Sequence, residues 1–336
     1  MLAVIVALIL GSAPPHAASA APSRTKCDRF ASPKGTDASP GTFARPYRTV
    51  QKLVETLGRG QTGCLRGGRY RQGEVTIRRN GIRLTSYRRE RATLIGRLRV
   101  NADAVTVTRL RLDGRNPRDL PSPTINADDA TFRGDDVSSR GTASCFLLGG
   151  TTEVRHPIIE GNRIHDCGVA TTDYDHGIYM SDVDGAVITG NTIYDNGSRG
   201  VKVGPDSQGA VIRANLIDGN PIGLTFSGDD SSASSHNVVV HNVIANSTRW
   251  WNVQSYWSGQ EGTDNILRRN CVHGGSPNPH YNENGGVSDD HRGFVTEQNL
   301  VAAPDYVDRG AKDFRLRANS PCRRVYKASS SRSGKR

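Results

Sequence analysis

The chain has 336 residues, a formal net charge of +11 and only 6% aromatic residues. This length suits one large or two ordinary domains. Beyond the first residues, no segment approaches the length of a transmembrane helix, which argues against a chain that spans a membrane. A basic balance of this size suits nucleic acid, an anionic surface or an acidic polymer as partner.

Residues 1–20 are predicted to form a secretory signal peptide. The apolar run LAVIVALILG is too short to span a bilayer, and Ala18-Ser19-Ala20 supplies small residues for cleavage, although no Lys or Arg precedes the run. We therefore expect a secreted, extracellular protein. For such a protein an acidic polysaccharide is the expected partner, and we expect neither nucleic acid nor a membrane to be bound.

The cysteine content fits the oxidising compartment that secretion implies. Six cysteines allow 15 connectivities. Among these we predict the pairs Cys27–Cys64, Cys145–Cys167 and Cys271–Cys322. No Cys-x-x-Cys motif or Cys/His cluster occurs, so no metal site is predicted.

The first predicted element is an amphipathic helix over about 46–57, after a stretch rich in Pro, Gly and Ser. Val50, Leu53, Val54 and Leu57 follow the spacing of one helix face, and Gly58 ends the pattern.

From about residue 80 the chain repeats itself. Short strand-like runs alternate with Gly, Asn and Asp turns, and one position recurs at intervals of 27, 29, 24, 27, 28 and 29 residues. The residues at this position are Asp135, Asn162, Asn191, Asn215, Asn242, Asn270 and Asn299. Repeats of this length indicate a solenoid.

We predict an all-β fold, a right-handed single-stranded parallel β-helix (solenoid) in which each repeat is one coil. Stacked coils lie about 4.8 Å apart, so the recurring Asn side chains would form a buried hydrogen-bonded ladder. We expect one domain over 26–326, with the 46–57 helix covering its N-terminal end, and a disordered basic tail at 327–336. A β-propeller or sandwich is the alternative, but neither carries Asn at one place in each repeat.

The segment over 31–52 resembles the entry motif of secreted parallel β-helix polysaccharide lyases of the pectate-lyase-like superfamily. The shared residues are Ser32-Pro33, Gly35, Asp37, Gly41-Thr42 and Pro46-Tyr47-Arg48-Thr49-Val50-Gln51. In these proteins a capping helix and then a Gly-Asp-x-Val strand follow, whereas Gln61 stands here in place of the Asp. Because lyases, epimerases, hydrolases and non-enzymatic proteins share this architecture, the resemblance predicts a fold more than a reaction.

The run Asp173-Tyr174-Asp175-His176 resembles the Asp-Pro-His region of alginate C5-epimerases, and an Asp195-Asn196-Gly197 turn follows in both. The resemblance implies that Tyr, His, Lys and Asp side chains surround the sugar. Tyr174 replaces the Pro, and Asp175 is directly adjacent to His176, so the spacing departs from the family pattern.

Aligning one strand of each coil predicts a column of outward-facing residues. These are Leu147, Tyr179, Lys202, Thr225, Gln254 and Ser288. The preceding turns contribute His176, Arg199 and Trp251, and the following turns contribute Asp182, Asp206, Asp229 and Asp230. Trp251 is predicted either to stack on a sugar ring or to pack under a loop.

This column suits removal of the proton next to the carboxylate of a uronic acid. Lys202, His176 and Tyr179 are the predicted proton-transfer groups, and Asp175 is predicted to orient His176. Arg199 is predicted to bind the substrate carboxylate. The other predicted substrate-binding residues are Asp173, Asp206, Gln254, Trp251, Asp229 and Asp230. The predicted function is β-elimination or C5-epimerisation of an acidic polysaccharide.

Two other functions stay open. Paired carboxylates on neighbouring coils, such as Asp206 with Asp229 or Asp230, would suit a glycoside hydrolase, although Asp also caps turns. A non-catalytic, carbohydrate-binding β-helix is the third option. Bound Ca²⁺ is compatible with the resemblance to lyases, but no ligand set is legible in the sequence. We expect a monomer.

Overall fold

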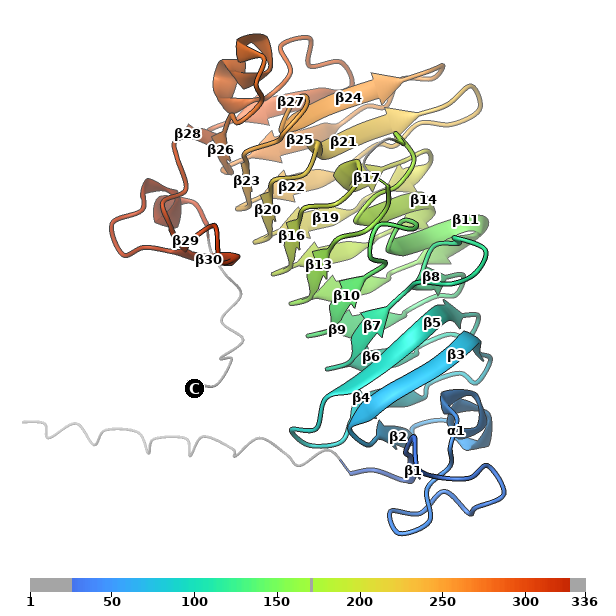
Figure 1. Ribbon diagram of the computed structural model, residues 1–336. Coiled ribbons are helices and arrows are strands. Elements are labelled where there is room, and N and C mark those ends of the chain that lie inside the picture. The colour runs from blue at the N-terminus through green and yellow to red at the C-terminus, as the bar shows by residue number, and fades with distance from the viewer. Residues whose placement is uncertain (1–25, 170–171, 327–336) are drawn as a thin grey trace, which may run out of the picture.

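Three strands and three turns per coil wind into a right-handed parallel β-solenoid, shown in Figure 1. The computed structural model describes residues 26–169 and 172–326. The predicted signal peptide and the predicted basic tail lie outside the described residues. The all-β fold class and the parallel coils are confirmed.

The first face of the solenoid is an 11-stranded parallel sheet with one strand from each coil. Its strands are β1 (Arg29–Ala31), β2 (Thr62–Leu65), β4 (Arg83–Ser86), β6 (Thr106–Thr108), β9 (Thr131–Arg133), β12 (Ile158–Glu160), β15 (Val187–Thr189), β19 (Val211–Arg213), β22 (Val238–Val240), β25 (Asn265–Arg268) and β27 (Phe294–Glu297).

The second and third faces belong to one 17-stranded sheet, because the long strands β3 (Gly68–Ile77) and β5 (Ala92–Val100) run through both. The second face continues with β7 (Arg111–Asp113), β10 (Asp136–Ser138), β13 (Arg163–His165), β16 (Thr192–Tyr194), β20 (Leu216–Asp218), β23 (Val243–Ala245), β26 (Cys271–His273) and β28 (Leu300–Val301). The third face continues with β8 (Thr124–Ile125), β11 (Phe146–Arg155), β14 (Ile178–Asp184), β17 (Arg199–Val203), β18 (Ser207–Gln208), β21 (Ile222–Gly228) and β24 (Val253–Trp257).

The core is a set of aliphatic columns that run along the solenoid axis. On the first face Ile159, Ile188, Ile212, Val239 and Leu267 are register partners, and all five are fully buried. Burying one such side chain contributes about 1.5–3 kcal/mol, so the columns drive the stacking of the coils. Because every strand hides alternate residues, the residues between them face outward.

The predicted asparagine ladder is confirmed. The Asn215 side-chain oxygen accepts hydrogen bonds from the backbone and side-chain N–H groups of Asn191, at 2.9 and 3.0 Å. The Asn215 amide in turn donates to Ile188 O and to the Asn242 side chain, at 2.9 and 3.0 Å. The same pattern runs from Asn162 to Asn299, and Asp135 joins it through its backbone N–H, which donates to the Asn162 side chain.

Two shorter ladders were not predicted. Asn196 donates to Asn220 at one turn, and Asn237 donates to Asn265 at another. All four side chains are buried. At these two turns, the buried amide of one coil therefore finds its hydrogen-bond partner in the next coil.

The N-terminal end is covered by α1 (Val50–Thr56), which packs on β1, β2 and β3. The helix is shorter than predicted, because the Asp37 carboxylate accepts the backbone N–H groups of Arg48 and Thr49 and holds them outside the helix. Thr49 is the N-cap, and its hydroxyl accepts from Lys52 N at 3.0 Å. All three predicted disulfides are present.

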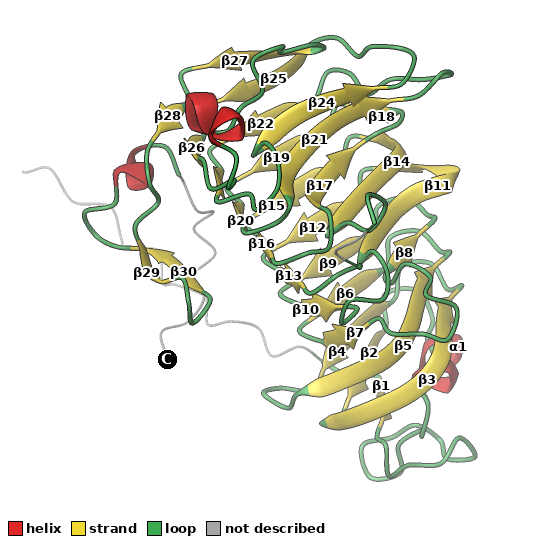
Figure 2. Ribbon diagram, turned by 45° about the horizontal axis from the view of Figure 1, so that its top comes forward, coloured by secondary structure: helices red, strands yellow, loops and turns green. Residues whose placement is uncertain are grey.

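The C-terminal segment folds back as an antiparallel hairpin of β29 (Tyr306–Asp308) and β30 (Asp313–Leu316), followed by a 3-10 turn, η2 (Pro321–Arg324). In Figures 1 and 2 this hairpin lies beside the second face rather than extending the solenoid. Phe314 packs on Tyr194 of β16, and Arg309 forms an ion pair with buried Asp218 of β20 at 2.6 Å. The sequence pattern did not predict this hairpin.

Replacing Asn215 with Ala is expected to lower the free energy of unfolding by about 2–4 kcal/mol, because it leaves the buried backbone N–H of Asn191 without an acceptor and removes the side-chain bonds to Asn191 and Asn242. Urea unfolding followed by circular dichroism measures the change. Asn299→Ala, at the half-buried end of the ladder, is the matched control and should cost less. Equal losses in the two variants would contradict a cooperative ladder.

Candidate functional site

A polar column crosses the third face where the sequence predicted it. Tyr179 of β14 is the register partner of Leu147 and of Lys202 in β17, and Lys202 is paired with Thr225 in β21. The column continues through Gln254 in β24, and the bridge between Val253 and Val287 brings Ser288 into line. Outward alternation along each strand therefore brings these side chains together, one per coil.

Lys202 lies over the ring of Tyr179, with its Nζ 4.7 Å from the ring centroid. Burial and, to a smaller extent, the positive charge of Arg199 lower the pKa of Lys202 to about 8, while Asp229 acts in the opposite sense. Among the described residues, no carboxylate lies close enough to form an ion pair with this ammonium group. Lys202 therefore has a substantial neutral population near pH 8.

Tyr179 is suited to stay protonated. Burial raises the pKa of its hydroxyl, and the charges of Asp182 and Asp229 add to that effect, while a hydrogen bond with Ser181 opposes it. A protonated phenol beside a neutral amine pairs a proton donor with a proton acceptor in one column.

His176 is buried behind the column, with 1% of its surface exposed. Its ring meets the Tyr179 ring edge-on at 5.3 Å, and its Nδ1 accepts the Arg199 backbone N–H at 3.5 Å. Burial, helped by the charges of Arg199 and Lys202, holds the pKa of His176 well below its ordinary value. The ring is therefore neutral, and it supports Tyr179 and the backbone of β17.

Arg199 is also largely buried, with 8% of its surface exposed, and burial lowers its pKa. Its Nη1 donates to Asp173 O and to Ser198 Oγ, whereas its Nε is buried without a hydrogen-bond partner. The Asp173 carboxylate forms an ion pair with Arg249 at 3.2 Å. Arg199 and Arg249 therefore both contact Asp173, and the charge of Arg199 reaches Lys202 in the column.

The other predicted carboxylates mostly cap turns. The Asp175 carboxylate accepts from Val169 N and the Thr172 hydroxyl, so it orders its own loop instead of orienting His176. Asp229 accepts from Ser231 and Ser232 in its turn. The Gln208 amide donates to Asp206, and Asp230 is exposed in the turn after β21.

Trp251 is not an exposed platform. It is 7% exposed and lies edge-on against His280 and Tyr281 of η1 (Pro279–Gly285), at 5.0 and 5.3 Å. Of the two roles predicted for it, packing under a loop is the one that the structure has.

Three residues beside the column were not predicted as site residues. Tyr174 and Tyr256 are 82% and 59% exposed, and both lie within electrostatic reach of Arg199, as Arg249 does. Tyr256 could have been found, because it is the next outward residue after Gln254 on β24. Tyr174 and Arg249 lie in loops, where no strand alternation assigns a direction.

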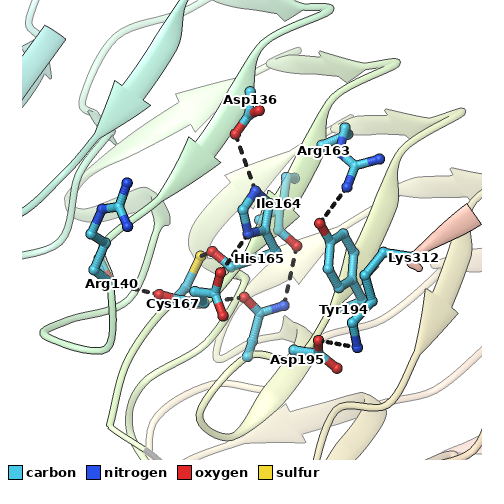
Figure 3. A network of polar contacts seen from close by, with 12 residues as sticks. Asp136, Arg140, Arg163, Ile164, His165, Cys167, Tyr194, Asp195 and Lys312 are labelled. Atoms are coloured by element: carbon cyan, nitrogen blue, oxygen red, sulfur yellow. Dashed lines mark hydrogen bonds and ion pairs between the residues drawn. The ribbon is translucent and has the colours of Figure 1, made fainter. Parts of the chain in front are cut away.

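A second polar cluster lies on the second face, around His165 (Figure 3). Its Nε2 contacts Asp136 at 3.1 Å, its Nδ1 contacts Asp166 at 2.7 Å, and its ring stacks on Tyr194 at 5.0 Å. Burial alone would lower the pKa of His165, but the hydrogen bonds and charges of Asp136 and Asp166 outweigh it and raise that pKa. Lys312 of the C-terminal hairpin lies 5.7 Å from the Tyr194 ring centroid and also forms an ion pair with Asp195.

Residues 126–275 match the family model described as "Periplasmic copper-binding protein (NosD)", which is 150 of 336 residues. Among residues 26–169 and 172–326, no three His, Cys, Asp or Glu side chains are grouped to hold a metal ion, and all six cysteines form disulfides. The described residues therefore do not fit a copper site. Nor is any helix in these two ranges long and apolar enough to cross a bilayer.

Solved structures resemble the chain in fold at low sequence identity. Pectate lyase Pel9A is 13% identical over 88% of this chain and 91% of its own, with a TM-score of 0.63. XylC in complex with xylose is 11% identical over 74% of this chain and 69% of its own, with a TM-score of 0.53. The A-module of Azotobacter vinelandii mannuronan C-5 epimerase AlgE6 is 15% identical over 76% of this chain and 90% of its own, with a TM-score of 0.43. This superposition is too loose to bear on function. No curated protein sequence matches significantly.

Titration of Lys202 tests the electrostatics of the column. In NMR spectra of the protein with ¹³C-methylated lysines, one lysine signal should titrate with a pKa of about 8. The Lys202→Ala variant should lack this signal. Arg199→Gln should raise this pKa, because it removes a neighbouring positive charge, whereas exposed Arg268→Gln on β25 should leave it unchanged. An unshifted signal in Arg199→Gln would contradict the coupling.

His165 should make stability depend on pH. Its folded pKa is raised, so its contribution is fully present below the unfolded value and is lost as pH rises through the folded value. Urea unfolding between about pH 5.5 and about pH 8.5 should therefore show the wild type losing stability relative to His165→Asn. Parallel curves for the two proteins would refute this role.

Proposed function

We propose that this chain is an exported enzyme that acts on an acidic polysaccharide by removing the proton next to a uronate carboxylate. The observation that carries the proposal is the pairing of Lys202, whose pKa is lowered to about 8, with the protonated Tyr179 in one outward column. The similarity to a pectate lyase bears on the fold and not on the reaction. The three disulfides support an exported chain.

Each part of the reaction has a candidate group. Arg199 and Arg249 neutralise the substrate carboxylate, which acidifies the neighbouring C–H bond. Neutral Lys202 takes the proton, and the resulting electron pair forms a carbon–carbon double bond as the bond to the leaving oxygen breaks. The Tyr179 hydroxyl protonates that oxygen. In epimerisation the first step is the same, and a proton returns to the carbon from the opposite face.

His176 acts through its neighbours in this scheme. With 1% of its surface exposed, it supports the Tyr179 ring and accepts the Arg199 backbone N–H rather than touching the sugar. The exposed Tyr174 and Tyr256 flank the cationic side and offer flat surfaces to sugar rings. Elimination or epimerisation is favoured over hydrolysis, because the turn contacts of Asp229 and Asp206 occupy the carboxylates that hydrolysis would use.

The test is a product screen over polygalacturonate, alginate and other uronate polymers. Elimination produces chain ends that absorb in the ultraviolet, and epimerisation inverts C5, which NMR detects. Lys202→Ala should lower kcat by roughly 10²–10⁴-fold, as expected for loss of a general base. His176→Ala should also lower kcat, while Lys34→Ala, an exposed lysine of the N-terminal segment, should not.

The pH profile is a separate check. Because the base must be neutral, kcat/KM should rise with pH and level off above about 8. Reducing ends without ultraviolet absorbance would indicate hydrolysis, and binding without any product would indicate a non-catalytic protein. Full activity in Lys202→Ala would reject the site assignment.

A further inference from the structure

The positive charge of the chain is concentrated in its first coils. Residues 59–118 contain 16 Arg, no Lys, and four acidic residues, a formal charge of 16 − 4 = +12, against +11 for the whole chain. The exposed members of this set are Arg59, Arg69, Arg71, Arg78, Arg79, Arg83, Arg88, Arg89, Arg91, Arg109, Arg111 and Arg118. The coils that carry the Lys202 column lie farther toward the C-terminus (Figure 1), and residues 140–290 contain nine Lys and Arg against 17 Asp and Glu, a net negative charge.

Three of these arginines line one hollow, where the turns after β4 and β6 lead into the second face. Arg91, Arg109 and Arg111 surround a volume of about 270 Å³, together with Thr93 and Asp136. Three guanidinium groups and one carboxylate face this space, so it has an excess of two positive charges. A hollow of this size accommodates a carboxylated sugar ring.

The guanidinium groups are partly held in place. Arg109 donates from Nε and Nη2 to the Thr85 hydroxyl, at 3.3 and 3.1 Å. Arg111 contacts the Asp136 carboxylate at 3.3 Å, on a half-exposed surface. Within the described part of the chain Arg91 has no ion-pair partner, although it lies at the rim. The hollow therefore contains guanidinium donors that no carboxylate among the described residues neutralises, and these donors can bind an anion.

The cations also recur along the solenoid. Arg69, Thr93 and Arg111 are register partners on β3, β5 and β7, and Arg91 lies two residues before Thr93. Neighbouring strands are about 4.8 Å apart, close to the rise of one sugar in an extended polysaccharide. A polymer with one carboxylate per sugar, lying along the axis, would therefore meet a cation at each coil.

We propose that this hollow and its neighbouring arginines, the basic groove, form a second binding site for the carboxylates of an acidic polysaccharide, apart from the Lys202 column. The inference shares its ligand class with the proposed function and rests on it for that class. The aromatic rings nearby favour a polysaccharide over single-stranded nucleic acid. The Arg66 guanidinium lies 4.5 Å from the Phe43 ring centroid and that of Arg88 lies 5.0 Å from the Tyr87 ring centroid, so one face of each ring is already covered and is not available to stack on a base.

Binding to immobilised polygalacturonate tests the proposal, with all proteins carrying Lys202→Ala so that the polymer is not consumed. Replacing Arg91, Arg109 and Arg111 with Gln should weaken binding roughly tenfold, by loss of three exposed ion contacts, and lower the eluting salt concentration. The charge-matched control replaces Arg213, Arg268 and Arg324, exposed residues elsewhere on the surface, and should change binding less than about twofold.

The single substitution Arg91→Gln breaks no ion pair among the described residues of the folded protein, so it should not change stability. It should weaken binding by about two- to fivefold. Equal weakening by the two triple variants would overturn the proposal, since net charge alone would then explain binding. Displacement of polygalacturonate by duplex DNA at equal charge concentration would overturn the assignment to a polysaccharide. If no polymer yields product, the proposed function fails while this binding result still stands on its own.

Discussion

From Asn162 to Asn299, each coil stacks on the next through side-chain amides that are buried between them. In the main ladder, each asparagine accepts two N–H groups from one neighbour and donates to the other, so a coil cannot slip by one residue without stranding several polar groups. The aliphatic columns supply most of the driving force, but they would tolerate other registers. The amides are what makes one register unique.

That register determines the chemistry available on the third face. Tyr179, Lys202 and Thr225 lie one strand spacing apart because their coils are held in step, and the positive charge of Arg199 acts on Lys202 for the same reason. A neutral histidine behind the column adds packing without adding charge. Rigidity of this kind lets a lysine keep a lowered pKa, because the surrounding structure cannot relax to solvate it.

The repeat explains how much of the structure could be predicted from the sequence. The Asn ladder, the Cys145–Cys167 disulfide and the column from Leu147 to Ser288 follow from coil length and strand alternation, both of which are visible in the chain. Loops obey neither rule. Asp175 bonds within its loop and Trp251 lies under a segment from the following coil, contacts that no periodicity encodes.

The C-terminal hairpin gives this linear array a contact of a different kind. In a solenoid each coil touches only its neighbours, so unfolding can begin at one end and proceed coil by coil. Here Arg309 and Lys312 reach Asp218 and Asp195, in coils that lie well before the last one, and the Cys271–Cys322 bond anchors the hairpin to the end. Fraying of the terminal coils must therefore also displace the hairpin, which makes this half of the molecule open as one cooperative unit.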